Sequence, residues 1–161
     1  MPPHALYELS IAVVDAAGKS LKATWPLAGC DAPSGLAIDR STHTLFAACD
    51  NSKLAVVNSE TGKLTQMLPI GDDCDAVAFD PSTGYIFASN GDGKLTVIRK
   101  AGQDRYTVVQ NLVSQAGSKT MGLDSKTHRI FLPAAKFTGN PTEHPRPSVV
   151  EGSVSMLVIG R

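Results

Sequence analysis

The feature that most constrains this chain is an internal repeat of a little over 40 residues. Three apolar stretches each end in an aspartate, and the successive aspartates lie 41 and then 44 residues apart. These stretches are Gly35–Asp39, Ala76–Asp80 and Met121–Asp124. Self-similarity at such a period is the signature of a propeller or solenoid, so we expect a fold built from similar units.

Each apolar stretch is followed by the same order of further segments. A polar turn leads into a segment with apolar and aromatic residues, and segments rich in β-forming residues come next. The second segments are 40–46, 81–87 and 125–131, the third are 53–58, 94–99 and 153–159, and the fourth are 63–68 and 105–112. No apolar period of 3.6 residues extends beyond two turns, so almost no helix is expected. The sequence predicts an all-β fold whose units are β-propeller blades of four antiparallel strands.

The repeats divide residues 1–161 into parts of a single partial β-propeller. Residues near the start match a third and a fourth strand, which indicates a start in the middle of a blade. We expect half a blade at 1–26, full blades at 27–68 and 69–112, and a blade lacking its fourth strand at 113–161. About three blades are half a propeller, and open sheet edges invite further pairing, so we expect oligomerisation to complete the ring.

The charge and apolar patterns argue against two kinds of partner. Lys plus Arg and Asp plus Glu both number 15, so no net charge attracts nucleic acid or an anionic membrane. No apolar run approaches the roughly 18 residues of a membrane helix, and the first residues lack the pattern of a signal peptide. We therefore expect no nucleic acid and no membrane as partner.

The three cysteines, Cys30, Cys49 and Cys74, leave two interpretations open. They lack the spacing of a structural zinc site. They can be small, partly buried apolar residues. Alternatively, Cys30 precedes a first strand and Cys49 ends the adjacent second strand, so antiparallel pairing would bring them close enough for a disulfide, which implies an oxidising compartment.

Acidic and amide residues are concentrated in the loops that precede first strands and that join second to third strands. In a propeller these loops surround the mouth of the central channel, where oxygen ligands could bind a divalent cation such as Ca²⁺. The candidate ligand-binding residues are Asp31, Asp50, Asn51, Asp73, Asp75, Asn90 and His144, and the candidate metal ligands among them are Asp73 and Asp75. The alternative interpretation is that short Asp and Asn side chains stabilise turns.

Several motifs together resemble the YVTN-type repeat β-propellers of bacteria, specifically the C-terminal half of a YncE-like propeller. The motifs are Thr24–Leu27, Pro33–Asp39, Leu45–Asn51, Phe87–Gly93, Thr127–Phe131 and Pro145–Gly152. The resemblance implies a ring of about twice this length and a periplasmic or secreted location, although we expect no signal peptide from the first residues. Two explanations remain: a fragment, or a homodimer through open blade edges in which residues 19–25 of a partner supply the missing fourth strand.

The sequence favours a non-catalytic function. It contains no G-x-S-x-G elbow, no H-E-x-x-H motif and no complete phosphate-binding loop. We expect a scaffold or binding module that recognises a small ligand, metal or peptide at the channel face. The alternative is a metal-dependent, lactonase-like hydrolase that uses the acidic mouth of the channel.

Overall fold

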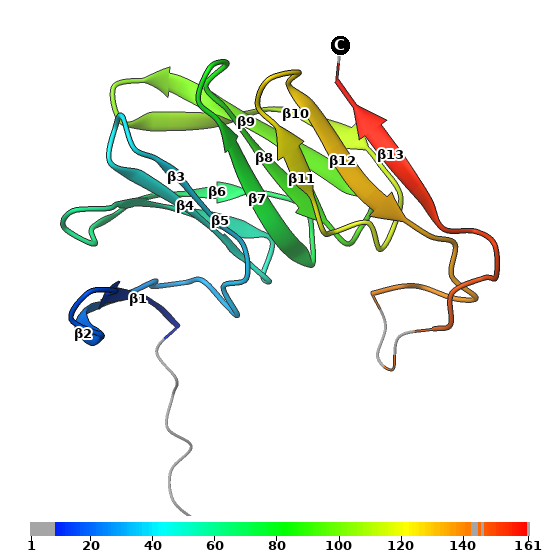
Figure 1. Ribbon diagram of the computed structural model, residues 1–161, viewed down its shortest axis with the longest axis horizontal. Coiled ribbons are helices and arrows are strands. Elements are labelled where there is room, and N and C mark those ends of the chain that lie inside the picture. Colours follow the sequence, from blue (N-terminus) through cyan, green and yellow to red (C-terminus); the bar gives the residue numbers. More distant parts are fainter. Residues whose placement is uncertain (1–8, 143–144, 146, 161) are drawn as a thin grey trace, which may run out of the picture.

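The computed structural model describes residues 9–142, 145 and 147–160, which form four antiparallel sheets and no helix (Figure 1). The first sheet contains β1 (Ser10–Asp15) and β2 (Ser20–Pro26). The second contains β3 (Leu36–Asp39), β4 (Thr44–Cys49), β5 (Lys53–Asn58) and β6 (Leu64–Pro69). The third contains β7 (Cys74–Asp80), β8 (Tyr85–Asn90), β9 (Lys94–Gly102) and β10 (Arg105–Val113), and the fourth contains β11 (Gly122–Asp124), β12 (Arg129–Ala134) and β13 (Ser155–Ile159).

Every sheet follows the chain order, so each is an antiparallel meander. This arrangement confirms the prediction of an all-β fold with four-stranded blades. Within the described part of the chain there is also no helix that could cross a membrane.

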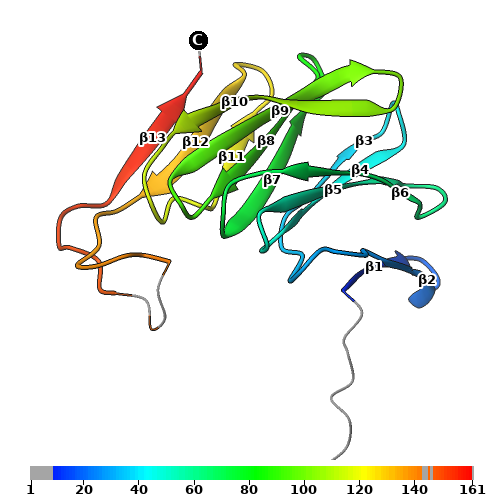
Figure 2. The ribbon, with the colours of Figure 1, turned by 180° about the vertical axis from the view of Figure 1, so that it is seen from behind.

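The sheets lie side by side in a fan, as the two opposite views in Figures 1 and 2 show. The first strands are neighbours, because β3 contacts β7 and β7 contacts β11. The fourth strands β6 and β10 also contact each other. First strands thus form one edge of the fan and fourth strands the other, which is how propeller blades are placed around an axis.

The turns between first and second strands explain why an aspartate recurs at each repeat. Asp39 and Asp80 each accept a hydrogen bond from the backbone N–H two residues on, at 2.9 and 3.1 Å, and Asp124 does the same at 3.0 Å. Each turn then contains a residue with positive φ, which is His43, Gly84 or His128. The repeated aspartates are therefore turn-forming residues.

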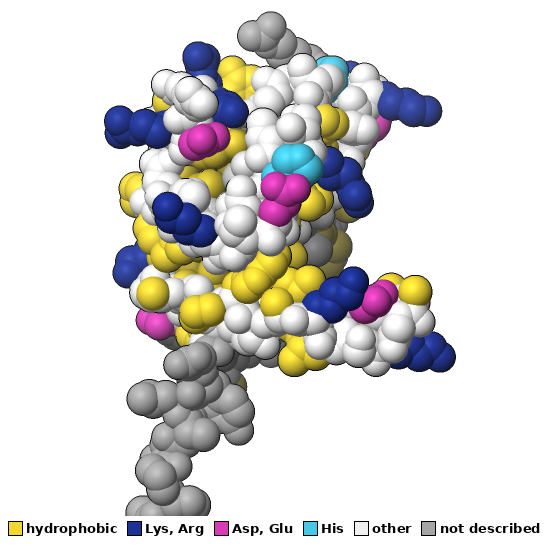
Figure 3. Space-filling model, turned by 90° about the vertical axis from the view of Figure 1, so that its left-hand side faces the viewer, with side chains coloured by type: hydrophobic (Ala, Val, Ile, Leu, Met, Phe, Trp, Pro, Cys, Tyr) yellow, Lys and Arg dark blue, Asp and Glu magenta, His cyan; other side chains and the backbone are white. Residues whose placement is uncertain are grey.

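Three apolar clusters fill the spaces between neighbouring sheets. The clusters are centred on Leu45, Ala55 and Val57 between the first and second sheets, on Phe46, Ile86 and Ile98 between the second and third, and on Leu95, Ile130 and Leu132 between the third and fourth. Val14 and Leu21 remain exposed on the first sheet. Figure 3 looks at this side of the molecule and shows hydrophobic side chains across it, with most lysines and arginines near the outline.

Candidate functional site

Three of the predicted ligand-binding residues do lie together on the face formed by the loops between blades and between second and third strands. The Asn51 side chain accepts a hydrogen bond from the Asp31 N–H at 3.2 Å and donates one to the Gly29 carbonyl at 3.1 Å. The Asp50 N–H donates to the Asp31 carbonyl at 2.7 Å. These contacts fix one loop against the next, and both the oxygen and the nitrogen of the Asn51 amide take part in them.

A disulfide lies beneath this loop pair. Cys30 and Cys49 are joined, with their Cα atoms 5.2 Å apart, and both are buried. Cys74 is a buried free cysteine, and burial is the main reason that the pKa of its thiol is raised to about 12. The Cys74 thiol therefore stays protonated and unreactive at ordinary pH.

The acidic segment around Asp73 is held by contacts to neighbouring loops. The Asp72 carboxylate accepts a hydrogen bond from the Ser52 hydroxyl at 3.0 Å, and Asp73 forms an ion pair with Lys119 at 2.7 Å. Asp75 is exposed on β7, at a bulge of the strand. No group of three His, Cys, Asp or Glu side chains that could hold a metal ion occurs in the described ranges.

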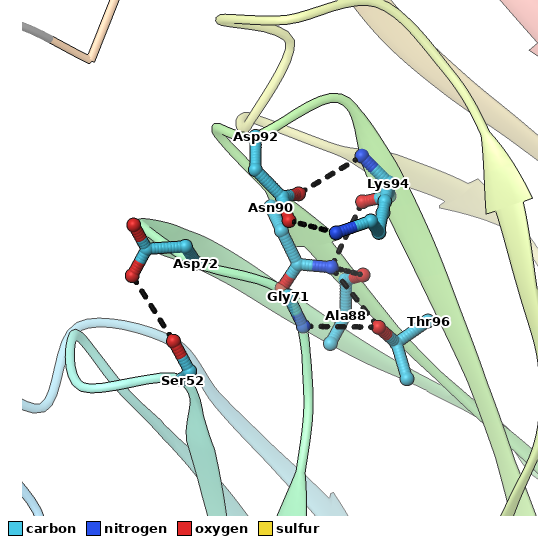
Figure 4. Close-up of polar contacts among 8 residues, drawn as sticks. All are labelled: Ser52, Gly71, Asp72, Ala88, Asn90, Asp92, Lys94 and Thr96. Atoms are coloured by element: carbon cyan, nitrogen blue, oxygen red, sulfur yellow. Dashed lines mark hydrogen bonds and ion pairs between the residues drawn. The ribbon is translucent and has the colours of Figure 1, made fainter.

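Asn90, the last residue of β8, is completely buried, although the sequence placed it among loop ligands (Figure 4). Its side-chain amide donates hydrogen bonds to the carbonyls of Ala88 and Lys94 and to the Thr96 hydroxyl, at 2.8 to 3.1 Å. A Cβ atom at Gly71 would lie 2.7 Å from this side chain. The buried Asn90 side chain thus joins the end of β8 to the start of β9. His144 lies outside the described residues.

A cavity of about 640 Å³ opens between the third and fourth sheets. Hydrophobic side chains form most of its wall, and every polar lining residue except Gln110 lies at the turns between first and second strands. The hydrophobic lining residues are Tyr85, Phe87, Val97, Val109, Leu112, Ile130 and Ile159, and the polar ones are Asp80, Thr83, Gln110, Thr127 and His128. We call this cavity the interblade cleft.

The polar end of the interblade cleft is built around Asp80, which is 1% exposed. Burial raises the pKa of this carboxyl, but hydrogen bonds from Ser82, Thr83 and His128 outweigh that effect and lower the pKa to about 2. His128 lies with Nδ1 2.7 Å from Oδ2 of Asp80 and 3.3 Å from the Ser82 hydroxyl. The Asp80 carboxylate therefore fixes the orientation of the His128 imidazole.

This cluster contains the residue types of a catalytic triad without its arrangement. In a triad the serine and the aspartate contact different nitrogens of the imidazole. Here Ser82 and Asp80 both contact Nδ1 of His128, and Ser82 also donates a hydrogen bond to Asp80 at 2.8 Å. The arrangement can orient Nε2 of His128 toward a ligand, but it does not activate the Ser82 hydroxyl.

The sequence did not reveal the interblade cleft, because the cleft depends on contacts between blades. His43 and His128 occupy equivalent turns between first and second strands. Both do have positive φ, 53° and 56°. Their partners differ, since His43 lies 3.6 Å from the exposed Glu60 of its own blade. The available signal was the apolar-aromatic pair Tyr85 and Phe87, which alternates with buried residues and therefore faces the following blade.

The sheets and their arrangement define the class of this chain, an all-β protein whose antiparallel sheets are arranged as β-propeller blades. The solved structure of Kuenenia stuttgartiensis hydrazine synthase contains a chain with a similar fold. The TM-score is 0.70 at 13% sequence identity, and the similarity covers 81% of this chain and 37% of the other, so the present chain spans well under half of that protein chain. No protein-family model and no curated protein sequence matches. At this identity the likeness shows the fold alone.

Proposed function

We propose that this chain is a non-catalytic β-propeller binding module of the YVTN-type, YncE-like group, and that its ligand occupies the interblade cleft. The observation that carries the proposal is the cleft itself. Its volume of about 640 Å³ and its apolar wall with a few polar groups are the usual properties of a ligand site. The sequence motifs quoted above support the assignment to the YVTN-type group.

The polar end of the cleft favours binding over chemistry. His128 is 46% exposed, and its Nδ1 atom is occupied by Asp80, so Nε2 is the atom left to contact a ligand. The hydrolase alternative needs a metal site, and the described residues contain no group of three suitable side chains. The metal-dependent, lactonase-like hydrolase stays the alternative prediction.

The loop face contributes mainly to the scaffold in this proposal. The Asn51 amide, the Asp72 carboxylate and the Asp73 carboxylate already contact other loops. Recognition of a ligand or a Ca²⁺ ion at this face stays a prediction, and so does a homodimer through open blade edges.

The proposal can be tested with N-acetyl-tyrosinamide as a small probe that has an aromatic ring and hydrogen-bonding groups. We expect it to shift the methyl NMR signals of Val97, Leu112 and Ile159, which line the cleft. Val109→Lys should abolish these shifts, because Val109 lines the cleft and is 45% exposed. Val113→Lys is the matched control on the same strand, 90% exposed and outside the cleft. Shifts confined to the loop face, or no shifts at all, would contradict the proposal.

A further inference from the structure

A second, smaller cavity lies between the second and third sheets, apart from the interblade cleft. Its volume is about 110 Å³, several times the roughly 30 Å³ that one water molecule occupies in the liquid. Its walls belong to the two four-stranded sheets and their turns. The polar lining residues are Thr42, Thr44, Asn58, Thr65, Asp104 and Tyr106. We call this cavity the threonine pocket.

The hairpin of β9 and β10 is fixed against the second sheet, and this contact forms one wall of the threonine pocket. The Gln66 amide of β6 donates to the Tyr106 carbonyl at 2.8 Å, and the Tyr106 N–H donates to the Gln66 side-chain oxygen at 3.0 Å. Tyr106 is 5% exposed, and its ring packs edge-on against Phe46 with the ring centroids 5.0 Å apart. The hairpin end that carries Asp104 is therefore held beside the second sheet before any ligand arrives.

The threonine hydroxyls offer lone pairs to the pocket, because each hydroxyl has one proton and that proton is already used. The Thr42 hydroxyl donates to Oδ2 of Asp39 at 2.7 Å. The Thr65 hydroxyl donates to the Val56 carbonyl at 3.0 Å, and the Thr44 hydroxyl donates to the carbonyl of residue 42 at 3.2 Å. The hydroxyl oxygens of Thr42 and Thr44 lie only 3.0 Å apart. A hydrogen-bond donor in the pocket would therefore meet several acceptors.

The other polar groups of the pocket add one negative charge and one donor. Asp104 is exposed, and its carboxylate forms no ion pair with any other residue that the structure describes. The Tyr106 hydroxyl lies 3.5 Å from Oγ1 of Thr44, longer than the roughly 2.7 Å of an ordinary O–H···O hydrogen bond. The Asn58 side-chain oxygen accepts from two backbone N–H groups of the following turn, so its amide nitrogen is the donor of this wall. The pocket is thus rich in acceptors and carries a single carboxylate.

From this pattern we infer that the threonine pocket binds a small primary ammonium group. Such a group has one positive charge and three N–H donors, which match the Asp104 carboxylate and the threonine oxygens. A guanidinium fits less well, because its planar fork needs two acceptors in one plane. Ca²⁺ also fits less well, because it takes about six to eight oxygen ligands and the lining has a single carboxylate. The site goes beyond the proposed function, since no lining residue is shared with the interblade cleft.

A primary ammonium group reaches such a pocket either as a free small amine or as the end of a lysine side chain. The test therefore titrates the full chain with methylammonium and, separately, with N-acetyl-lysinamide, at constant ionic strength. We expect shifts of the methyl NMR signals of Thr44, Val56 and Thr65, which line the pocket. Tetramethylammonium has the same charge without N–H donors and should not shift them. Binding of methylammonium alone identifies a free amine as the ligand, whereas equal or tighter binding of N-acetyl-lysinamide identifies a lysine side chain.

Two variants with matched controls locate the binding site. Asp104→Asn should weaken the affinity for methylammonium about fivefold, because it removes the one charge opposite the ammonium at an exposed position. Thr65→Val should weaken it about threefold, because it removes one acceptor and keeps the branched side chain. Glu60→Gln and Thr107→Val change an exposed carboxylate and an exposed hydroxyl outside the pocket, so both should leave the affinity unchanged.

Three results would overturn the inference. If neither amine shifts the signals, water alone fills the pocket. Equal shifts with tetramethylammonium or with sodium would mean that the protein responds to charge and not to an ammonium group. An affinity that Asp104→Asn leaves unchanged, or that Glu60→Gln lowers as much, would place the bound amine elsewhere. Asp104→Asn should not alter the binding of N-acetyl-tyrosinamide to the interblade cleft, so failure of this inference leaves the proposed function in place.

Discussion

The Nδ1 atom of His128 lies 2.7 Å from the Oδ2 atom of Asp80, so a histidine of the last blade contacts a buried carboxylate of the blade before it. The equivalent His43 makes no such contact with a preceding blade, and its partner Glu60 belongs to the same sheet. Of the two equivalent turns, the one at His128 therefore links neighbouring blades at the polar end of the interblade cleft.

The hydrogen bonds that Asp80 accepts make stability depend on acid pH, and those from Ser82 and Thr83 contribute more than the one from His128. The pKa of Asp80 is lowered from 3.8 to about 2, so the folded state binds its proton more weakly than the unfolded state. The resulting stabilisation, roughly 2 kcal/mol, is complete above about pH 4 and is lost as the pH falls through about 2. We expect Asp80→Asn to lower the free energy of unfolding in urea by roughly that amount at pH 7 and by much less at pH 2.

Asp39→Asn is the matched control for this measurement. Asp39 forms the same turn, and hydrogen bonds from Ser41 and Thr42 lower its pKa despite burial, but none of the described histidines contacts it. His128→Gln should therefore change the acid profile of the wild type and leave the effect of Asp39→Asn unaltered. Equal effects of His128→Gln and His43→Gln would show that the interblade contact contributes nothing.

A second prediction compares two glutamines at equivalent positions. Gln66→Ala removes two hydrogen bonds to the backbone of Tyr106 and should lower the free energy of unfolding by about 2 kcal/mol. Gln110→Ala should lower it by less than about 0.5 kcal/mol, because an exposed side chain without a partner in the described structure is replaced. Thermal and urea unfolding of the two variants measure the difference. Equal losses would mean that the equivalence of the two glutamines is wrong.

The blades were predictable because their determinants are local. The aspartates at 39, 80 and 124 mark turns by their own hydrogen bonds, and alternating apolar residues mark strands. Asn90 could also have been assigned correctly, since it alternates with Ile86 and Ala88, which are buried on one face. The sequence analysis placed Asn90 in a loop because its amide is polar, whereas Asn90 is the last residue of β8.

The interblade cleft was not predictable in the same way, because it depends on contacts between repeats. Trp25 fills the space between the first and second sheets, and Tyr106 fills the space between the second and third. These two residues occupy different positions of the fourth strand. The repeat predicts that the last blade lacks a fourth strand, but it does not reveal which side chains of the neighbouring blade are left uncovered. The three-dimensional packing of neighbouring blades was needed to show it.

A third prediction uses two glycines that share a φ of 72° and differ in their surroundings. Gly84→Ala has open space around the new methyl group, so only the backbone strain is added, about 1 kcal/mol. Gly62→Ala meets the Trp25 ring as well and should cost more than about 3 kcal/mol. Urea unfolding followed by Trp25 fluorescence measures both, and Trp25 is the one tryptophan of the chain. Equal losses of the free energy of unfolding would show that Trp25 does not fill the space between the first and second sheets.

The last prediction concerns the cysteines. In the folded, unreduced chain we expect no thiol to react with a disulfide reagent at pH 8, because Cys74 is buried and burial raises the pKa of its thiol to about 12. Unfolding without a reductant should expose one thiol, and unfolding after reduction should expose all three. Three reactive thiols without a reductant would contradict the Cys30–Cys49 disulfide.

Reduction should also destabilise the fold. The disulfide joins residues 19 apart in the sequence, and closing a loop of that size restricts the unfolded chain enough to stabilise the folded state by roughly 3 kcal/mol. Cys74→Ala keeps this bond and provides a matched control, since it should remove the single free thiol without changing the response to reductant. If reduction leaves the free energy of unfolding unchanged in both proteins, the fixed position of the Asp31 and Asn51 loops must come from their hydrogen bonds alone.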